Sequence, residues 1–394
     1  MDTSQVIKLR EQLEVLWSHC HSQMDDAENL YDGNIEVEHE TGQAKHIPPY
    51  AAYHVESAVG SIIVENPVIT IPPIKETQDE KKRADRLEKG ANAEIRLVDK
   101  QLALPLLHLL KHSAVLYGLG VAKGPYWNPL SPDKPEKEKE MEQWRRDRRR
   151  HFPILVSPLD PRSVMWEPGS GIPRAIFETS TRRAAEVNEL YGTAESGDII
   201  KWMEYWDQER GLYFVGDRVV KEIENLGGFI PYLLVFGPFG RQPTTSRRGY
   251  DPAAFIRGIL YPAKSNLEAI AQMATWKLAI TRRAIPKRIT RGVTDPAVLE
   301  KIADPTVDAE LGKGPEAVEV EWLAVAPISP VLEQFYAQTT AEIEMLTRSN
   351  IKTGRPQGQV TSGRQAALYR SWADEGQKTL IGNLERVLET FVVN

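Results

Sequence analysis

The chain has 394 residues, of which 41% are hydrophobic and 26% charged, and its formal net charge is -6 at neutral pH. This composition is typical of a folded, soluble protein of two or three domains, and the acidic balance excludes general adhesion to nucleic acid. The one cysteine, Cys20, excludes an intrachain disulfide and a cysteine-based metal site. No apolar run has the ~18–20 residues of a membrane span, and the charged N-terminal stretch predicts no signal peptide.

The N-terminal part of the chain is predicted to be mainly helical. Apolar residues recur at helical spacing over residues 4–31 and again over 50–65, with an exposed, extended segment between them. The stretch VITIPP alternates and predicts a short strand. Residues 76–113 predict a long helical region in which Pro105 begins a new helix or kinks the existing one.

A run of charge that changes sign follows at residues 128–150. Acidic and lysine-rich sequence comes first, and five arginines lie between Arg145 and Arg150. The interpretation that we favour is a solvated helix with ion pairs along it. The alternative is a basic patch for nucleic acid, although the neighbouring glutamates would weaken its field.

The middle of the chain predicts a mixed α+β module. Short strands alternate with Pro, Gly and Asp turns over residues 152–178, and a short helix is expected at 181–191. Residues 199–236 predict a meander of strands that includes FIPYLLVFG as its last member. A loop rich in Gly, Pro and Arg then covers residues 237–249.

The C-terminal part predicts long helices that enclose a smaller insert. A helix is expected over 252–283, because Asp251-Pro252 is a good start signal, and residues 285–327 predict a small α/β insert. A second helix follows at 329–349, and a third is expected from residue 364. Between these two lies the loop NIKTGRPQGQVTSG, which is too polar to be buried and should face solvent or a polar partner.

The usual catalytic motifs are absent from the sequence. It contains no P-loop, HExxH, GxSxG or paired CxxC motif. His108 and His112 have the i, i+4 spacing of metal ligands but lack a third ligand nearby, so structural histidines are the better interpretation. We therefore expect a protein that is not an enzyme and that has no cofactor and no metal.

The order of these parts resembles the portal proteins of tailed bacteriophages. The resemblance covers nearly the whole chain and is carried by VESAVGSIIVENPVITIP, LLHLLKHSAVLYGLGVAKG, VSPLDPRSVMWEPGSG, the meander with WMEYWD, ILYPAKSNLEAIAQMATWKLAI and TSGRQAAL. Each segment is a weak signal alone, and it is their combination in this order that is specific.

The resemblance implies an α+β portal-protein fold. It divides the chain into a mixed α/β wing at 1–250, a first stem helix at 251–284, a small α/β clip at 285–328, a second stem helix at 329–349, a tunnel loop at 350–363 and a helix at 364–394 that returns to the wing or the base of the crown. Portal proteins usually continue into a crown, so a short or missing crown is expected here.

The resemblance also implies the function and the partners. Portal subunits form a ring, usually of twelve identical copies, at a unique capsid vertex of the virion, after assembly in the host cytoplasm. Double-stranded DNA is packaged and ejected through the ring without sequence-specific contacts. The expected protein partners are the terminase large subunit, the head-completion or tail adaptor protein, and the major capsid and scaffolding proteins, with no membrane contact.

Three groups of residues are the candidate sites under this interpretation. The DNA-facing tunnel loop comprises Lys352, Thr353, Gly354, Arg355, Gln357 and Gln359. Clip residues for docking a partner are Arg282, Arg283, Lys287, Arg288, Arg291, Glu319 and Glu321. The subunit interface is expected at Phe255, Ile259, Leu267, Ile270, Met273 and Leu278. The alternatives are an oligomeric nucleic-acid-binding adaptor without a channel, which would use the arginines at 145–150 and the basic residues at 282–291, and an enzyme whose site is unrecognised.

Overall fold

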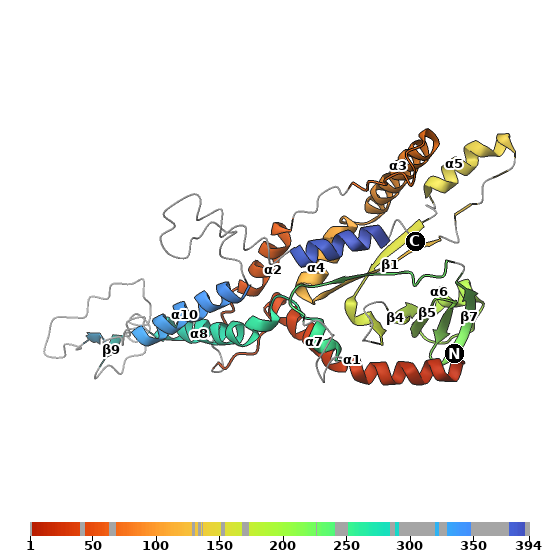
Figure 1. Ribbon diagram of the computed structural model, residues 1–394. Helices are drawn as coiled ribbons and strands as arrows, with labels where there is room; N and C mark the ends of the chain where they lie inside the picture. The colour runs from red at the N-terminus through yellow and green to blue at the C-terminus, as the bar shows by residue number, and fades with distance from the viewer. Residues whose placement is uncertain are drawn as a thin grey trace. The chain divides into compact units, whose positions relative to one another are not determined.

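The computed structural model describes residues 2–39, 44–62, 68–127, 131–132, 135, 137–150, 154–167, 173–225, 227–240, 251–283, 288–290, 320–322, 329–347 and 378–390 (Figure 1). The chain divides into two compact units. The first comprises Met1–Asp32, Ala51–Ala263 and Met345–Asn394, and the second comprises Gly33–Tyr50 and Lys264–Glu344. The protein is a mixed α+β structure with antiparallel sheets, which confirms the predicted class.

Four helices begin the chain. They are α1 (Thr3–Asp32), α2 (Tyr50–Ser61), α3 (Gln78–Gln101) and α4 (Leu106–Leu116). The apolar spacing of the first segment therefore forms one helix of 30 residues. Pro105 is the N-cap residue of α4. Of the two predicted outcomes, a new helix or a kink, the new helix is therefore the one observed. Among the described residues, no helix is long and apolar enough to cross a membrane.

The predicted strand at VITIPP is absent from the described part of that stretch, residues 68–73. The backbone amide of Ile69 donates to Oδ1 of Asn92 at 2.9 Å, and Asn92 Nδ2 donates back to the Ile69 carbonyl at 2.9 Å. The amide of Ile71 donates to Oε2 of Glu88 at 3.2 Å. Polar side chains of α3 thus satisfy these backbone groups in place of a neighbouring strand.

Two antiparallel sheets belong to the first unit. The five-stranded sheet has the order β3 (Val164–Trp166), β4 (Ala175–Arg183), β5 (Ile199–Asp207), β6 (Arg210–Val215) and β7 (Arg218–Glu224). The three-stranded sheet has the order β2 (Ile154–Leu159), β1 (Leu119–Trp127) and β8 (Tyr232–Phe236). The meander therefore ends at β7, and β8, which was expected to continue it, pairs with β1 instead.

Shorter elements connect the strands. Helix α6 (Ala184–Tyr191) lies between β4 and β5 and ends at Gly192, whose φ of 65° is the left-handed conformation common after a helix. The charge run forms the 3-10 helix η1 (Glu138–Glu140) and the helix α5 (Met141–Arg150). The 3-10 helix η2 (Pro161–Ser163) precedes β3, and its Arg162 donates to Asp25 of α1 at 2.9 Å.

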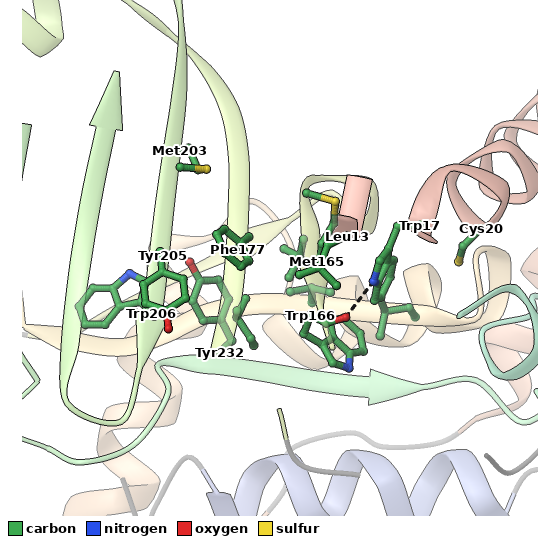
Figure 2. Packing of buried hydrophobic residues seen from close by; sticks show 14 of the residues in the cluster. Leu13, Trp17, Cys20, Met165, Trp166, Phe177, Met203, Tyr205, Trp206 and Tyr232 are labelled. Atoms are coloured by element: carbon green, nitrogen blue, oxygen red, sulfur yellow. Dashed lines mark hydrogen bonds between the residues drawn. The ribbon is translucent and has the colours of Figure 1, made fainter. Parts of the chain in front are cut away.

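The core of the first unit forms where α1 packs on the five-stranded sheet. Trp17 of α1 and Trp166 of β3 lie with their rings 4.4 Å apart, and the indole N–H of Trp17 donates to the Trp166 carbonyl at 2.9 Å (Figure 2). Phe177 and Tyr205 from β4 and β5 stack 5.0 Å apart in the same cluster. Large aromatic side chains supply much of the buried area of such a core.

The expected single helix over 252–283 is interrupted. Asp251 caps the short helix α7 (Pro252–Phe255), the 3-10 helix η3 (Tyr261–Ala263) follows, and α8 (Lys264–Arg283) begins only at Lys264. Between α7 and η3 the backbone packs on the end of α4. The amide of Ile259 donates to the Val115 carbonyl at 2.8 Å, and a Cβ on Gly258 would lie 1.8 Å from the Leu116 oxygen. This close backbone approach replaces the helical turn that local sequence favours.

The remaining elements of the described residues lie in the C-terminal third. They are β9 (Arg288–Thr290), β10 (Val320–Trp322), α10 (Pro330–Thr347) and a helix at 378–390. The last helix buries Leu380, Leu384 and Val387, and its Asn383 Nδ2 donates to the Phe236 carbonyl of β8 at 2.9 Å. It therefore packs on the three-stranded sheet of the first unit.

Candidate functional site

Helices α8 and α10 form an antiparallel pair in the second unit. Nζ of Lys277 lies 2.7 Å from Oε1 of Glu333, and Nδ2 of Asn266 donates to Oε2 of Glu342 at 3.2 Å. Because the contacts move forward along α8 and backward along α10, the two helices run in opposite directions. A helix near Ser329–Ser349 was predicted, and α10 starts with Pro330 at its first position, where the missing amide hydrogen costs nothing.

A two-stranded ribbon lies in the sequence between these helices. Strands β9 and β10 are antiparallel, with Arg288 opposite Trp322, Ile289 opposite Glu321, and Thr290 opposite Val320. The ribbon brings together two parts of the chain that are separated by about thirty residues along the sequence. The described residues from 264 to 344 of the second unit therefore form, in sequence order, helix, strand, strand and helix.

The described residues 34–39 and 44–48 of the second unit are extended and are held on α8 by two polar side chains. Gln272 accepts from the backbone amide of Glu38 at 2.7 Å and donates to the carbonyl of the same residue at 2.8 Å. Thr275 makes the same paired contact with the amide and carbonyl of His46, both at 3.2 Å. The sequence predicted an extended and exposed segment here, and its attachment to α8 was missed. The signal was the pair of polar residues, i and i+3, on a mostly apolar helix.

Tyr336 joins α10 to both neighbouring elements of the unit. The ammonium of Lys277 lies 5.5 Å from the centre of its ring, a cation–π distance. Burial and the hydroxyl of Tyr50 raise the pKa of Tyr336 above its ordinary value, so the phenol stays neutral at physiological pH. Among the described residues, an ion pair, an amide contact and a cation–π contact thus connect the two helices.

The predicted clip residues are placed only in part. Arg282 and Arg283 end α8, while Arg288 and Glu321 lie on β9 and β10 at neighbouring positions of the ribbon. Lys287, Arg291 and Glu319 lie outside the described residues. The tunnel-loop residues Lys352, Thr353, Gly354, Arg355, Gln357 and Gln359 also lie outside the described residues, as does the whole of 350–363.

The residues predicted for a subunit interface mostly pack inside the chain. Ile259, Leu267, Ile270 and Met273 are buried, and Phe255 and Leu278 are half-buried. Phe255 packs against Phe236, with ring centres 6.2 Å apart. Much of the apolar surface that suggested a neighbouring subunit is therefore already covered within one chain.

Other apolar side chains of the same two helices are exposed. Val331 and Phe335 of α10 are 73% and 53% exposed, and Trp276 of α8 is 46% exposed. Val331 and Phe335 belong to a stripe of uncharged, exposed residues at helical spacing on α10. We call this stripe the neutral face; it comprises Val331, Gln334, Phe335, Gln338 and Ala341. Exposed apolar side chains grouped on one helix face are typical of interaction surfaces. Their spacing was readable in the sequence, but their exposure was not.

A second cluster, in the first unit, is a buried network of charges that the sequence did not reveal. Glu178 of β4 and Glu204 of β5 occupy opposite positions, and Lys123 of β1 reaches both carboxylates. Lys123 donates to Glu204 and lies 3.1 Å from Oε2 of Glu178, which also accepts the Tyr232 hydroxyl at 2.6 Å. The network therefore links the two sheets of the unit.

Glu204 accepts more hydrogen bonds than the other residues of this network. In addition to Lys123, it accepts from the indoles of Trp202 at 3.0 Å and Trp206 at 3.3 Å, and from Arg182 at 3.2 Å. Burial opposes its charge, but Lys123 and the two indole donors lower the pKa of Glu204. Burial likewise opposes the charge of Lys123, but Glu204 and Glu178 raise its pKa. Both groups are therefore charged at neutral pH.

The described residues contain no group of three or more His, Cys, Asp or Glu side chains placed to hold a metal ion. His112, one of the two spaced histidines on α4, instead lies 3.2 Å from Oε1 of Glu56 of α2. No model of a protein family matches the sequence. A search of curated proteins also finds no match.

Proposed function

We propose that this chain is the portal subunit of a tailed bacteriophage, a structural protein that forms a ring at one capsid vertex. The observation that carries the proposal is the order of elements in the second unit, where antiparallel helices α8 and α10 enclose the β9–β10 ribbon. This order matches the stem, clip and stem of the family that the sequence resembles. In this assignment residues 1–250 are the wing, and residues 350–363 are the tunnel loop.

Ring formation requires that two unlike surfaces of each copy meet. A heterologous contact repeated around a closed axis makes a ring, whereas an isologous contact stops at a dimer. The neutral face of α10 is a suitable surface, because it carries two large exposed apolar side chains, Val331 and Phe335, and no formal charge. Burying such a face costs no desolvation of ions. Its partner in the next copy would be a different surface, for which exposed Trp276 of α8 is a candidate.

Passage of DNA requires a channel that does not retain phosphates. Each phosphate neutralised by Lys or Arg adds affinity, so a uniformly basic channel would stall the strand. A subunit with a net charge of -6 and a few basic loop residues would instead favour passage. The proposed role is non-enzymatic. The terminase large subunit, then a head-completion or tail adaptor protein, would dock on the clip, and the capsid and scaffolding proteins would surround the ring in the virion.

The oligomeric state of the purified chain tests the proposal. Mass photometry and negative-stain microscopy over a range of salt concentrations should give closed rings with a central channel. The double variant Val331→Ser/Phe335→Ser should lose the rings, while Val15→Ser, at an apolar position of α1 that is 77% exposed, should keep them. A monomer or dimer under every condition would overturn the proposal. If such a dimer bound DNA, the adaptor alternative would replace it.

The tunnel-loop assignment has a separate test in a packaging assay. Deletion of residues 352–359 should leave the rings intact and impair the packaging or retention of DNA, because the contacts to the strand are lost while the subunit contacts are kept. Unchanged packaging by rings with the deletion would show that the loop assignment is wrong without affecting the ring itself.

A further inference from the structure

A cavity of about 450 Å³ lies in the first unit beside the buried charge network. Strands β4 to β7, strand β1, helix α6 and the connection from β7 to β8 all contribute to its wall. The residues that matter for what it could bind are Arg182, Tyr191, Glu204, Trp206, Tyr213 and Lys221. Its volume falls in the range of small-molecule sites.

The register of the sheet explains why these side chains meet. Glu178, Glu204, Tyr213 and Lys221 are paired in sequence across β4, β5, β6 and β7, so they form one row on one face of the sheet. Lys123 from the other sheet contacts both carboxylates at one end of the row. The exposed Lys221 stands at the other end, and the cavity lies over the row.

The charged groups that a ligand can reach are mainly cationic. Glu204 is buried, and both of its oxygens already accept hydrogen bonds. Arg182 is half-buried and donates one N–H to Glu204, although a guanidinium has five. Lys221 is exposed, and the acidic residue on the exposed rim is Glu224. An anionic group placed between Arg182 and Lys221 would meet two positive charges.

Part of the remaining wall is aromatic. Tyr191 and Tyr213 of the wall lie with ring centres 5.9 Å apart, and both pack on the buried Trp202, at 5.0 and 5.7 Å. Tyr213 also meets the Trp206 ring at 6.1 Å. Arg182 stacks over Trp202 at 4.8 Å, and Lys221 lies 5.7 Å from the Tyr191 ring. The two cations therefore stand directly beside ring faces. A planar ring on the ligand could pack on the tyrosines while its anionic substituent contacts the cations.

We propose that this cavity is a binding site for a small aromatic anion, a compound with one planar ring and an attached phosphate or carboxylate. The shared chemistry is a flat apolar body of limited size with a negative charge at its edge. The site belongs to the first unit alone, so the inference stands independently of ring formation and of the proposed role in DNA passage.

Phenyl phosphate is a suitable probe, with isothermal titration calorimetry of the full chain as the measurement. Inorganic phosphate tests the charge without the ring, benzyl alcohol tests the ring without the charge, and benzylamine tests the opposite charge. Phenyl phosphate should bind at least tenfold more tightly than each of the three. Benzoate in place of phenyl phosphate separates carboxylate from phosphate as the preferred anion. Equal affinity for phenyl phosphate and benzylamine, or no binding of phenyl phosphate at millimolar concentration, would overturn the proposal.

Two variants localise the binding. Lys221→Gln should weaken phenyl phosphate binding by about tenfold, because it removes one charge-assisted contact. Lys201→Gln is the matched control, since Lys201 lies on β5 of the same sheet and pairs with Glu14 outside the cavity. It should keep the wild-type affinity. If the two lysine variants behave alike, the probe binds elsewhere and the assignment of the cavity is wrong. Denaturant midpoints of both variants confirm that each is folded.

Discussion

Glu178 and Glu204 lie directly opposite each other on neighbouring strands, and both side chains are buried. Two like charges in such positions repel, and burial makes the repulsion stronger because the medium has a low dielectric constant. The ammonium of Lys123 contacts both carboxylates and offsets this repulsion. The cohesion of the two sheets in the first unit therefore depends on a cation from β1.

Replacing Lys123 with methionine should destabilise the protein by about 3–5 kcal/mol, because it leaves the carboxylates without their buried partner. Urea unfolding followed by circular dichroism measures the change. The double variant Lys123→Met/Glu204→Gln should recover part of the loss, since one of the two charges is also removed. Lys201→Met, at a surface position with an exposed ion pair, should change stability by less than about 1 kcal/mol. Equal stability of the two methionine variants would contradict this account of the network.

The buried His54 of α2 should make stability dependent on pH. Burial lowers the pKa of His54 from 6.5 to about 4 in the folded chain. Between these values the unfolded chain binds a proton that the folded chain does not. Stability should therefore rise with pH across this window, by at most about 1.4 kcal/mol per pH unit from this group, and be fully present above it.

Denaturant unfolding at several pH values between 4 and 7 checks the sign and the source of this effect. His54→Leu should show a shallower dependence than the wild type, because it lacks the titrating ring. Some dependence should remain, since burial also lowers the pKa of His21. Identical slopes for the wild type and His54→Leu would exclude His54 as a source.

The one cysteine should be unreactive in the folded chain. Cys20 is buried in α1, and burial together with the carboxylate of Asp251 raises its pKa to about 12. The thiolate is the reactive species, so little of it forms near neutral pH. A chromogenic disulfide reagent should react slowly with the native protein and with one equivalent per chain in denaturant. Fast, stoichiometric reaction without denaturant would show that this part of α1 opens readily.

Local signals in the sequence predicted local structure well. Pro105 separates α3 from α4 and Asp251 caps α7, because each of these residues acts on its own turn of backbone. The mixed α+β class followed from the alternation of such signals. The candidate helices of the second unit were found in the same way, and only the break before Lys264 was missed.

Contacts between distant residues could not be predicted. Lys123 and Glu204 are 81 positions apart, and the sequence around either residue does not indicate that the other is its partner. Two other contacts are also long-range and depend on how the whole chain folds. They are the pairing of β8 with β1 and the hydrogen bond between Gln272 and the backbone of Glu38. The cavity could not be predicted for the same reason, because its wall is formed by five strands, a helix and a loop.

Gly258 provides the sharpest test of the interrupted helix before α8. A Cβ at this position would lie 1.8 Å from the Leu116 carbonyl oxygen and 2.6 Å from its carbon, and backbone atoms cannot move aside as a flexible side chain can. Gly258→Ala should therefore destabilise the chain by several kcal/mol or force the segment away from α4. The expected cost resembles that of overpacking a core, at about 1–3 kcal/mol or more.

Gly60→Ala is the matched control for this prediction, measured by thermal and urea unfolding. Gly60 lies in α2, and a Cβ there would meet nothing within 4 Å. Alanine should thus stabilise the helix by roughly 0.5–1 kcal/mol through its lower conformational entropy in the unfolded state. The same substitution is then expected to have opposite signs at two glycines. If Gly258→Ala proved neutral, residues 256–260 would not pack on α4 as closely as the structure has them, and the continuous helix predicted from the sequence would again be the simpler interpretation.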